Sequence, residues 1–369
     1  MKPNKKGEKK NLPFGRRMLI FLAGVLAFVG LLAMIFCMMC PLVSPDKFVW
    51  LSFFGLAFWP ILFFNVLMFV ILLLLKSRKT VFISIISIAL SLPGLQKSFS
   101  TKNTNSDEGN VKIMTYNIAM FRSITDNAKS AELVEKDIVE MINSQNPDVV
   151  CLQESGRWND DKAGKFCEKI NCKYFFFDNS DIGTEIIFSK YPLEDDDFTD
   201  AFNKINYGVA KLVKGGSVGK FYVECVHLKS FMINNDEIAY VTDAKNYIEN
   251  SETVGKSLVK KLILGFENRT SESKFIVDNL PDMDNPLIIC GDFNDTPLSY
   301  TYHKMSKTGM SDAFLKAGNG IGKTYCGRLP LLRIDYLWTN DLIVPMTFEV
   351  LKFKQSDHYP VVMSFNVTH

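Results

Sequence analysis

Three long apolar runs dominate the first hundred residues of the chain. Each of the first two holds 28 consecutive uncharged residues, and the third, shorter run contains Pro93. A helix needs about 20 apolar residues to cross a bilayer. The pattern therefore predicts a transmembrane region over residues 18–97, with three helices at about 18–43, 49–75 and 80–96.

Basic residues flank these runs unevenly. Seven Lys and Arg residues precede the first run within residues 1–17, and Lys76, Arg78 and Lys79 separate the second run from the third. Positively charged segments stay in the cytoplasm. Residues 1–17 are therefore predicted to be a basic cytoplasmic tail, and the chain beyond the third helix is predicted to be extracytoplasmic. With only two crossings, it would face the cytoplasm instead.

Residues 98–110 are polar and lack periodicity, which is typical of a linker. Beyond them, in residues 111–369, alternating or continuously apolar runs predict strands at 111–117, 148–154, 185–192, 221–227, 286–294, 333–338 and 359–365. Helical spacing predicts helices over 130–144 and over most of 236–285, namely 238–248, 253–264 and 273–280. Many strands with interspersed helices indicate a mixed α/β domain of two packed sheets with outer helices.

Polar side chains stand at the ends of several of these strands. Asn117, Glu154 and His227 each follow an apolar strand directly. Taken singly, each has an ordinary explanation as a turn residue, a helix cap or a half-buried histidine. Asp292 and Asn294 are more informative, because an acid and an amide two residues apart at a strand end, after a glycine, have no obvious packing purpose.

A second polar group lies nearer the C-terminus. Asp335 falls in a short strand and could simply pair with Arg333, while Asp357 and His358 precede the last apolar strand. The joint occurrence of six such strand ends in one domain favours a catalytic site over six unrelated structural roles.

Charge is distributed unevenly, although the whole chain has a net charge of only +2. Residues 1–97 carry 12 Lys/Arg and 2 Asp/Glu, whereas residues 98–369 carry 30 and 38, a net charge of −8. Nucleic-acid-binding domains usually carry a basic stripe. The acidic part therefore lacks a general attraction to nucleic acid, but it could bind a phosphorylated substrate through a divalent cation.

The eight cysteines form no disulfide framework and no zinc motif. Cys151, Cys225 and Cys290 lie in buried-type strands, where cysteine acts as a small core residue. Cys167 and Cys172 could pair on a surface loop.

The strand-end segments resemble the endonuclease/exonuclease/phosphatase superfamily, which includes deoxyribonucleases, abasic-site endonucleases, neutral sphingomyelinases and inositol-polyphosphate 5-phosphatases. The matching segments occur in family order and cover essentially all of residues 111–369: Thr115–Asn117, Pro147–Glu154, Ile187–Pro192, Val226–Leu228, Gly291–Asn294, Arg333–Tyr336 and Ser356–His358. The resemblance implies a four-layer α/β sandwich, and the N-terminal helices resemble those of a membrane-anchored branch. Many nuclease members carry an Asp where this chain has Ala119, which weakens any second metal site.

The resemblance implies metal-assisted, in-line attack of water on a phosphoester. Glu154 and Asn117, with Asp357 as a third candidate, would bind Mg²⁺ or Mn²⁺, because oxygen ligands suit these ions better than zinc. Asp292 would orient or deprotonate the attacking water. Asn294 would donate a hydrogen bond to the phosphoryl oxygen as charge develops on it.

Two histidines complete the expected catalytic group. His358, paired with Asp335, would contact the scissile phosphate and carry a proton, with the carboxylate fixing the tautomer of the imidazole. His227 would be a second phosphate-binding or acid group, and Glu185 would orient it.

The substrate stays open at this level: nucleic acid, lipid phosphate or sugar phosphate, as a monoester or a diester. Specificity is expected to depend on residues 228–285 and on the loop Gly318–Leu332. A non-catalytic membrane-tethered binding module is disfavoured, because none of the expected catalytic residues is substituted. The chain is predicted to be an integral membrane enzyme with an extracytoplasmic catalytic domain, and no protein partner can be inferred.

Overall fold

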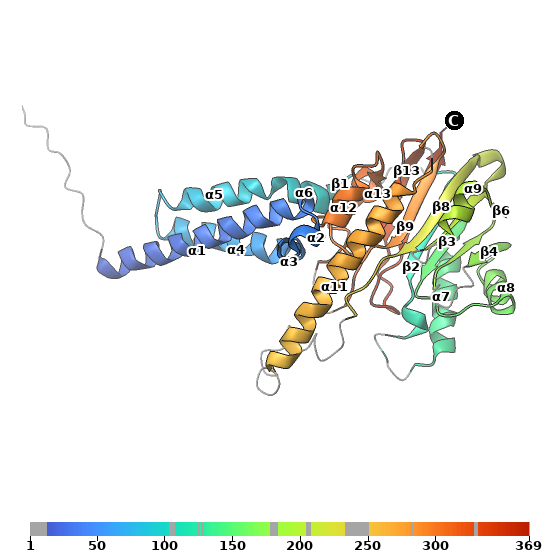
Figure 1. Cartoon of the computed structure of the whole chain (residues 1–369), viewed down its shortest axis with the longest axis horizontal. Coiled ribbons are helices and arrows are strands. Elements are labelled where there is room, and N and C mark those ends of the chain that lie inside the picture. Colours follow the sequence, from blue (N-terminus) through green and yellow to red (C-terminus); the bar gives the residue numbers. More distant parts are fainter. Residues whose placement is uncertain are drawn as a thin grey trace, which may run out of the picture.

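Two parts make up the molecule, an N-terminal helical region and an α/β domain beside it (Figure 1). The computed structural model describes residues 13–102, 108–123, 126, 129–177, 184–203, 208–232, 251–281, 283–327 and 331–368.

The helical region contains one uninterrupted apolar helix and two bent pairs of helices. α1 (Phe14–Met39) continues into the 3₁₀ turn η1 (Cys40–Leu42), and these 29 residues are long and apolar enough to cross a membrane. After the short α2 (Pro45–Phe48), α3 (Trp50–Leu56) meets α4 (Phe58–Leu74) at 68°, and α5 (Val81–Leu90) meets α6 (Leu92–Ser98) at 41°. If each bent pair is one span, the region has three, as the sequence predicts.

The two bends follow from prolines. Pro60 lies in the first turn of α4 and Pro93 in the first turn of α6. A proline has no N–H to donate, and its ring clashes with the carbonyl group four residues earlier, so the preceding helix stops. Asn65 of α4 donates a hydrogen bond to the Gly30 carbonyl of α1 at 3.1 Å, which is a contact between packed helices.

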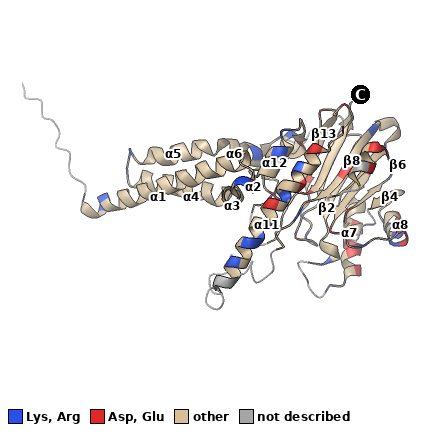
Figure 2. Ribbon diagram, viewed as in Figure 1, with Lys and Arg blue, Asp and Glu red and all other residues tan. Residues whose placement is uncertain are grey.

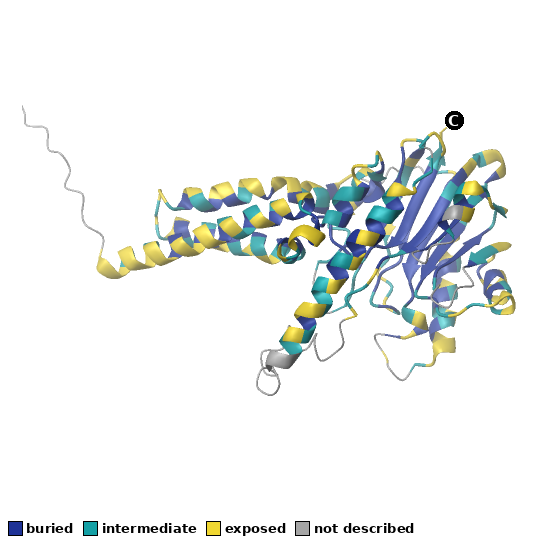
Figure 3. Cartoon of the chain, viewed as in Figure 1, coloured by how far each residue is buried: buried dark blue, intermediate teal, exposed yellow. Residues whose placement is uncertain are grey.

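The outer surface of this region is apolar. Figures 2 and 3 show long helices with few charges and many exposed residues, and the exposed side chains include Phe21, Phe28, Phe63 and Leu74. Soluble proteins rarely expose contiguous apolar surface on this scale. The surface is therefore of the kind that lipid, rather than water, covers.

The α/β domain is built on two mixed six-stranded sheets. One has the order β13-β14-β2-β3-β5-β4 and the other β10-β12-β9-β8-β7-β6. The strands of the first are β2 (Val111–Asn117), β3 (Val149–Gln153), β4 (Tyr174–Phe177), β5 (Ile186–Ser189), β13 (Ile343–Val350) and β14 (Val361–Val367). Those of the second are β6 (Leu193–Glu194), β7 (Gly208–Lys214), β8 (Lys220–His227), β9 (Leu287–Asp292), β10 (Ser311–Asp312) and β12 (Asp335–Thr339).

Helices cover the outer faces of both sheets. α7 (Ala131–Gln145) and α8 (Asp160–Lys169) pack on the first sheet, through a cluster that includes Val134, Ile138 and Phe166. α9 (Asp197–Phe202), α11 (Ser251–Asp278) and α12 (Tyr300–Met305) cover the second. The inner faces share a core that contains Cys151, Cys225 and Cys290. The result is the expected four-layer α/β sandwich.

Shorter elements complete the domain. They are the 3₁₀ turns η2 (Ala119–Phe121) and η3 (Gly216–Val218), α13 (Ala313–Ala317), and a small sheet in which β1 (Ser100–Thr101) pairs with β11 (Asn319–Gly320). The start of the predicted linker is therefore held against the domain.

The seven predicted strands are confirmed within three residues at each end, and five strands of the two sheets were missed: β4, β6, β7, β10 and β13. β7 contains the buried Lys211, which pairs with Asp195, and β13 contains Pro345 beside a bulge, so neither shows a clean alternation. The helices predicted at 253–264 and 273–280 form one continuous α11, and residues 238–248 lie outside the described residues. Cys167 and Cys172 are buried and not bonded to each other.

Gly291 occupies a position that only glycine fits. Its φ is +138°, and an added Cβ would lie 1.9 Å from the carbonyl oxygen of Val226 on the neighbouring strand β8. β8 and β9 can therefore stay paired up to their carboxyl ends only because residue 291 has no side chain.

We expect Gly291→Ala to lower the free energy of unfolding by about 3 kcal/mol or more, through backbone strain and a core clash. Gly216→Ala is the matched control, because Gly216 also has a positive φ, +62°, yet no atom lies within 4 Å of the added Cβ. It should cost only about 1 kcal/mol. Thermal unfolding of the detergent-solubilised chain measures both, and equal losses would contradict the steric argument.

Candidate functional site

The polar strand ends of both sheets meet at one edge of the sandwich. β2 and β3 run parallel, as do β8 and β9, so their carboxyl ends lie together and bring Asn117 beside Gln153 and His227 beside Asp292. β12 runs antiparallel to β9 and places Asp335, its first residue, opposite Asp292. The sandwich thus gathers residues that are more than 200 positions apart in the chain.

Asp292 is the centre of this cluster and is completely buried. Its Oδ2 accepts a hydrogen bond from Asn117 Nδ2 at 3.0 Å and lies 3.5 Å from His358 Nε2 and 3.8 Å from His227 Nε2. Its Oδ1 accepts a hydrogen bond from the Asn294 backbone N–H at 2.8 Å. One carboxylate therefore contacts residues from four separate chain segments.

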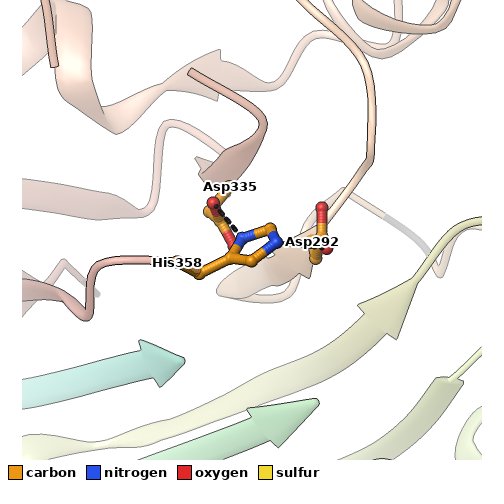
Figure 4. Close-up of side chains that lie close together, drawn as sticks. All are labelled: Asp292, Asp335 and His358. Atoms are coloured by element: carbon orange, nitrogen blue, oxygen red, sulfur yellow. Dashed lines mark hydrogen bonds and ion pairs between the residues drawn. The ribbon is translucent and has the colours of Figure 1, made fainter. Parts of the chain in front are cut away.

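Asp335 and His358 form a buried pair (Figure 4). His358 Nδ1 lies 3.0 and 2.9 Å from the two oxygens of Asp335, so its other nitrogen, Nε2, points toward Asp292. Thr324 holds the backbone of Asp335, because its hydroxyl accepts a hydrogen bond from the Asp335 backbone N–H at 3.1 Å. The ring of Tyr325 packs edge-on against His358, with 5.5 Å between ring centres.

Glu154 and His227 form the other half of the cluster. Glu154 Oε1 accepts a hydrogen bond from Asn117 Nδ2 at 3.1 Å and lies 3.5 Å from His227 Nε2. His227 Nδ1 lies 3.5 Å from Glu185 Oε1. Nε2 of His227 is buried, and no described residue forms a hydrogen bond with it, so this nitrogen is available to a ligand.

Two site residues adopt a backbone conformation that non-glycine residues rarely take. Glu154 has φ +47° and Asn294 has φ +52°. Strain of this kind costs about 1–3 kcal/mol per residue and persists where the surrounding structure requires it. Here the left-handed turns let the chain leave each strand while its last side chains stay at the site.

The local charges shift the pKa of three site groups. Burial alone would lower the pKa of His358, but the charges of Asp335 and Asp292 outweigh it and hold the pKa well above its ordinary value. Burial likewise opposes protonation of His227, yet the Glu185 hydrogen bond and the charges of Asp292 and Glu154 raise its pKa to about 9. Burial raises the pKa of Asp292 to about 6, although both histidines oppose the shift.

The cluster carries more acid than its cations can balance. Four carboxylates, from Glu154, Glu185, Asp292 and Asp335, face two histidines, and buried charge is costly unless it is paired. Asp292, Asp335 and His358 have ligand atoms within 4.8 Å of one another, close enough to hold a metal ion. The excess negative charge fits a bound cation.

A cavity of about 190 Å³ gives access to the cluster. Glu154, Asn294, Asp357 and His358 line one side of it. Asp357 is thus beside the site, while its backbone carbonyl accepts a hydrogen bond from the Cys326 N–H at 2.7 Å. The side chain of Asn294 donates to the Leu228 carbonyl at 2.9 Å and to Asp292 at 3.2 Å.

All nine predicted site residues lie at this edge. The alternative explanation of Asp335, a simple pairing with Arg333, is wrong. Arg333 pairs with Asp312 at 2.7 Å, not with Asp335, which pairs with His358. Sequence reasoning missed Thr324 and Tyr325, which position Asp335 and His358. Both residues lie in an irregular loop, where no periodic pattern of apolar residues identifies functional side chains. The one indication in the sequence was that they fall within Gly318–Leu332, the loop expected to determine substrate specificity.

Comparisons with known proteins agree with this geometry. A family model described as the endonuclease/exonuclease/phosphatase family matches residues 114–358, and a model described only as a domain of unknown function matches residues 16–98. A search of characterised proteins gave no match.

Two solved structures with the same fold are bacterial proteins. An endonuclease/exonuclease/phosphatase from Beutenbergia cavernae is 16% identical over 70% of this chain and 72% of its own, with a TM-score of 0.50. One from Bacteroides vulgatus is 16% identical over 70% of this chain and 98% of its own, also with a TM-score of 0.50. At identities this low, the similarity shows only that the fold is shared.

Glu185→Gln tests the cause of the raised His227 pKa. Removing the charge beside Nδ1 should lower that pKa by about 1–2 units from its value near 9, so the ring loses its proton at a lower pH. NMR titration of the histidine resonances in chelator-treated protein measures this shift. His303, on α12, is the internal control, and an unchanged His227 titration would contradict the proposed pairing.

Proposed function

The chain belongs to the endonuclease/exonuclease/phosphatase family, and on that premise we propose that it is a divalent-metal-dependent phosphoester hydrolase anchored in a membrane. The observation that carries the proposal is the position of the Asp335–His358 pair. Nδ1 of His358 is held by Asp335, Nε2 lies 3.5 Å from Asp292, and His358 and Glu154 line the same accessible cavity.

We assign metal binding to Glu154 and Asn117, with Asp357 as a further ligand. Their oxygen donors suit Mg²⁺ or Mn²⁺, and the excess of carboxylates at the site favours a cation. The Asn117 amide now donates to both Glu154 and Asp292, so a 180° turn of this amide would present its oxygen to the ion instead. When bound, such an ion neutralises phosphate charge and stabilises the transition state.

Asp292 is the proposed base for the attacking water. A pKa of about 6 leaves it mostly ionised at neutral pH while it remains basic enough to accept a proton. The oxygen of water forms a bond to phosphorus, the opposite phosphorus–oxygen ester bond breaks, and the water proton passes to Asp292. Asn294 holds the carboxylate in place through two hydrogen bonds and lies close enough to contact a phosphoryl oxygen.

The histidines supply positive charge and protons. The charges of Asp335 and Asp292 hold the pKa of His358 well above its ordinary value and so favour the protonated ring, and Asp335 holds it with Nε2 facing Asp292. His358 is suited to bind the phosphate and to protonate the leaving oxygen. Nε2 of His227 forms no hydrogen bond with a described residue, and Glu185 lies 3.5 Å from Nδ1. His227 is therefore the proposed second phosphate contact.

Nuclease activity is the second candidate, and two features disfavour it. The soluble part has a net charge of −8, which repels a polyanion. Ala119 stands where many nuclease members have a metal-binding Asp. Neither the net negative charge nor Ala119 argues against a smaller or membrane-borne phosphoester.

Replacing the central groups should abolish most turnover. We expect Asp292→Asn or His358→Gln to lower kcat for Mg²⁺-dependent hydrolysis by roughly 10²–10⁴-fold, the usual contribution of a general acid or base. Both changes preserve side-chain size, so the fold should persist, and circular dichroism checks this.

The matched controls are Asp341→Asn in the exposed turn after β12 and His303→Gln on α12. Both should keep the activity of the unaltered chain. Near-full activity in either site variant would rule out the assigned role of that residue.

With three spans the active domain would lie outside the cytoplasm, and this orientation can be tested with fusion proteins. Alkaline phosphatase fused after Lys97 should be active and a fluorescent protein fused there should be dark, because the positive loop at Lys76–Lys79 stays inside. Fusions after Arg78 are the control and should behave in the opposite way. A fluorescent fusion at Lys97 would place the domain in the cytoplasm.

A further inference from the structure

Two chemically different sets of residues line the cavity at the active site. One is the polar set Glu154, Asn294, Asp357 and His358. The other, called the apolar wall below, consists of Leu56, Phe231, Met232, Leu262, Leu332 and Ile334. Because Leu56 belongs to the helical region, a residue of the membrane anchor itself lines the active-site cavity.

The helical region is fixed rigidly to this side of the domain. Leu298, in the loop after β9, packs in one cluster with Met34, Cys37 and Phe58 of the helices. An added Cβ at Gly55 would lie 2.7 Å from the Leu298 carbonyl oxygen. Such close packing places Leu56 at the cavity permanently.

A buried arginine makes a second connection between the two parts. Arg333 donates from Nη2 to the Lys97 carbonyl at the end of α6, at 2.8 Å, and pairs through Nη1 with Asp312 at 2.7 Å. Its guanidinium lies 4.5 Å from the centre of the Phe314 ring. The end of the last membrane helix is thereby tied to the sheet that carries Asp335.

A row of aromatic rings leads from the helical region to the cavity. Trp50 stacks on Phe53 with 5.6 Å between ring centres, Phe53 meets Phe266 of α11 at 5.4 Å, and Phe266 meets Phe231 at 5.1 Å. The guanidinium of Arg269 lies 4.1 Å from the Phe231 ring centre and holds that ring in place. The cavity therefore continues into apolar surface that reaches the base of the membrane helices.

The outer end of this apolar surface is exposed. Trp50 is 52% exposed and Met232 is 67% exposed, although both are large apolar residues. Aromatic residues of this kind are enriched where a membrane meets water. Their exposure beside the membrane helices fits contact with the lipid surface.

The exposed half of α11 has the composition of a membrane-contacting helix. Val259, Ile263 and Leu264 line a shallow surface depression together with Lys256 and Lys260. Figure 2 shows lysines along this half of α11, which extends away from the sheets on the side of the helical region. Apolar residues flanked by lysines are typical of helices that lie at an anionic lipid surface.

From this arrangement we infer that the substrate is a phosphoester of a lipid, taken from the membrane in which the chain is anchored. The inference rests on the proposed phosphoester hydrolysis and specifies its substrate class. The acyl chain lies against Leu56, Phe231 and Leu262, and the phosphate faces His358 and Glu154. An acidic domain needs no charge attraction for such a substrate, because the bilayer already concentrates it beside the site.

Substrates that share a headgroup but differ in acyl-chain length test whether hydrolysis requires a lipid chain or only a phosphoester bond. The full chain in nanodiscs is given dioleoyl phosphatidic acid, phosphatidylglycerol, phosphatidylcholine or a phosphatidylinositol phosphate, and the soluble dibutyryl form of each, with Mg²⁺. p-Nitrophenyl phosphate, bis-p-nitrophenyl phosphate and an oligonucleotide are the lipid-free references. The dioctanoyl form of each lipid, with eight-carbon chains, completes the series. We expect kcat/KM for one headgroup to rise at least about tenfold from the four-carbon to the eight-carbon form. Full burial of the added methylenes would allow a larger rise.

Variants of the apolar wall test where the chain binds. Leu56→Asn and Leu262→Asn should each lower the ratio of long-chain to short-chain kcat/KM by about fivefold or more. Leu133→Asn, an exposed leucine on α7 remote from the cavity, is the matched control and should leave the ratio unchanged. Since Leu262 is on the domain and Leu56 on the anchor, a folding defect in one variant leaves the other as a test.

The outcomes distinguish a failure of the lipid inference from a failure of the proposed phosphoester hydrolysis. Equal rates for short and long chains, with Mg²⁺-dependent hydrolysis of the soluble esters, would overturn the lipid inference and leave the proposed function standing. Preference for the oligonucleotide would overturn it in favour of a nuclease. No Mg²⁺-dependent hydrolysis of any substrate would remove both.

Discussion

The buried carboxylate of Asp292 is the contact on which the rest of the site depends. It is completely buried, and it is approached by Asn117 and His358 from strand ends of one sheet and by His227 and Asp335 from strand ends of the other. A carboxylate in such a place must be paired or solvated. The two sheets therefore have to meet in register at this edge, and Gly291 is what permits β9 to approach β8 closely enough for that.

The helical region packs tightly against the α/β domain. Its contact with Leu298 and the Arg333–Lys97 hydrogen bond hold the cavity in a fixed orientation to the apolar helices. The orientation of these helices and access to the cavity are therefore linked, because Leu56 belongs to the helices and also lines the cavity. A freely tethered domain would not hold a residue of the helical region at its own cavity.

Particular residues show how far sequence reasoning reaches. Strands ending at Asn117, Glu154, His227 and Asp292 were visible because long apolar runs stop there at polar side chains. β7 and β13 were not, because a buried Lys211 and Pro345 interrupt the alternation that marks a strand. Thr324 and Tyr325, which position Asp335 and His358, lie in an irregular loop with no periodic pattern.

Local periodicity and motif order predicted the apolar helices, seven of the twelve strands of the two large sheets, the four-layer class and the residues that meet at the candidate site. The His358–Asp335 pair, which the family resemblance implies, is present, whereas only the packing of the sheets set the pairing of Arg333 with Asp312 and of Asn117 with both Glu154 and Asp292. The tertiary structure alone brought Leu56 to the catalytic cavity. Such contacts join residues far apart in the chain, and which of several acids meets a given base depends on sheet register and packing, which no local pattern encodes.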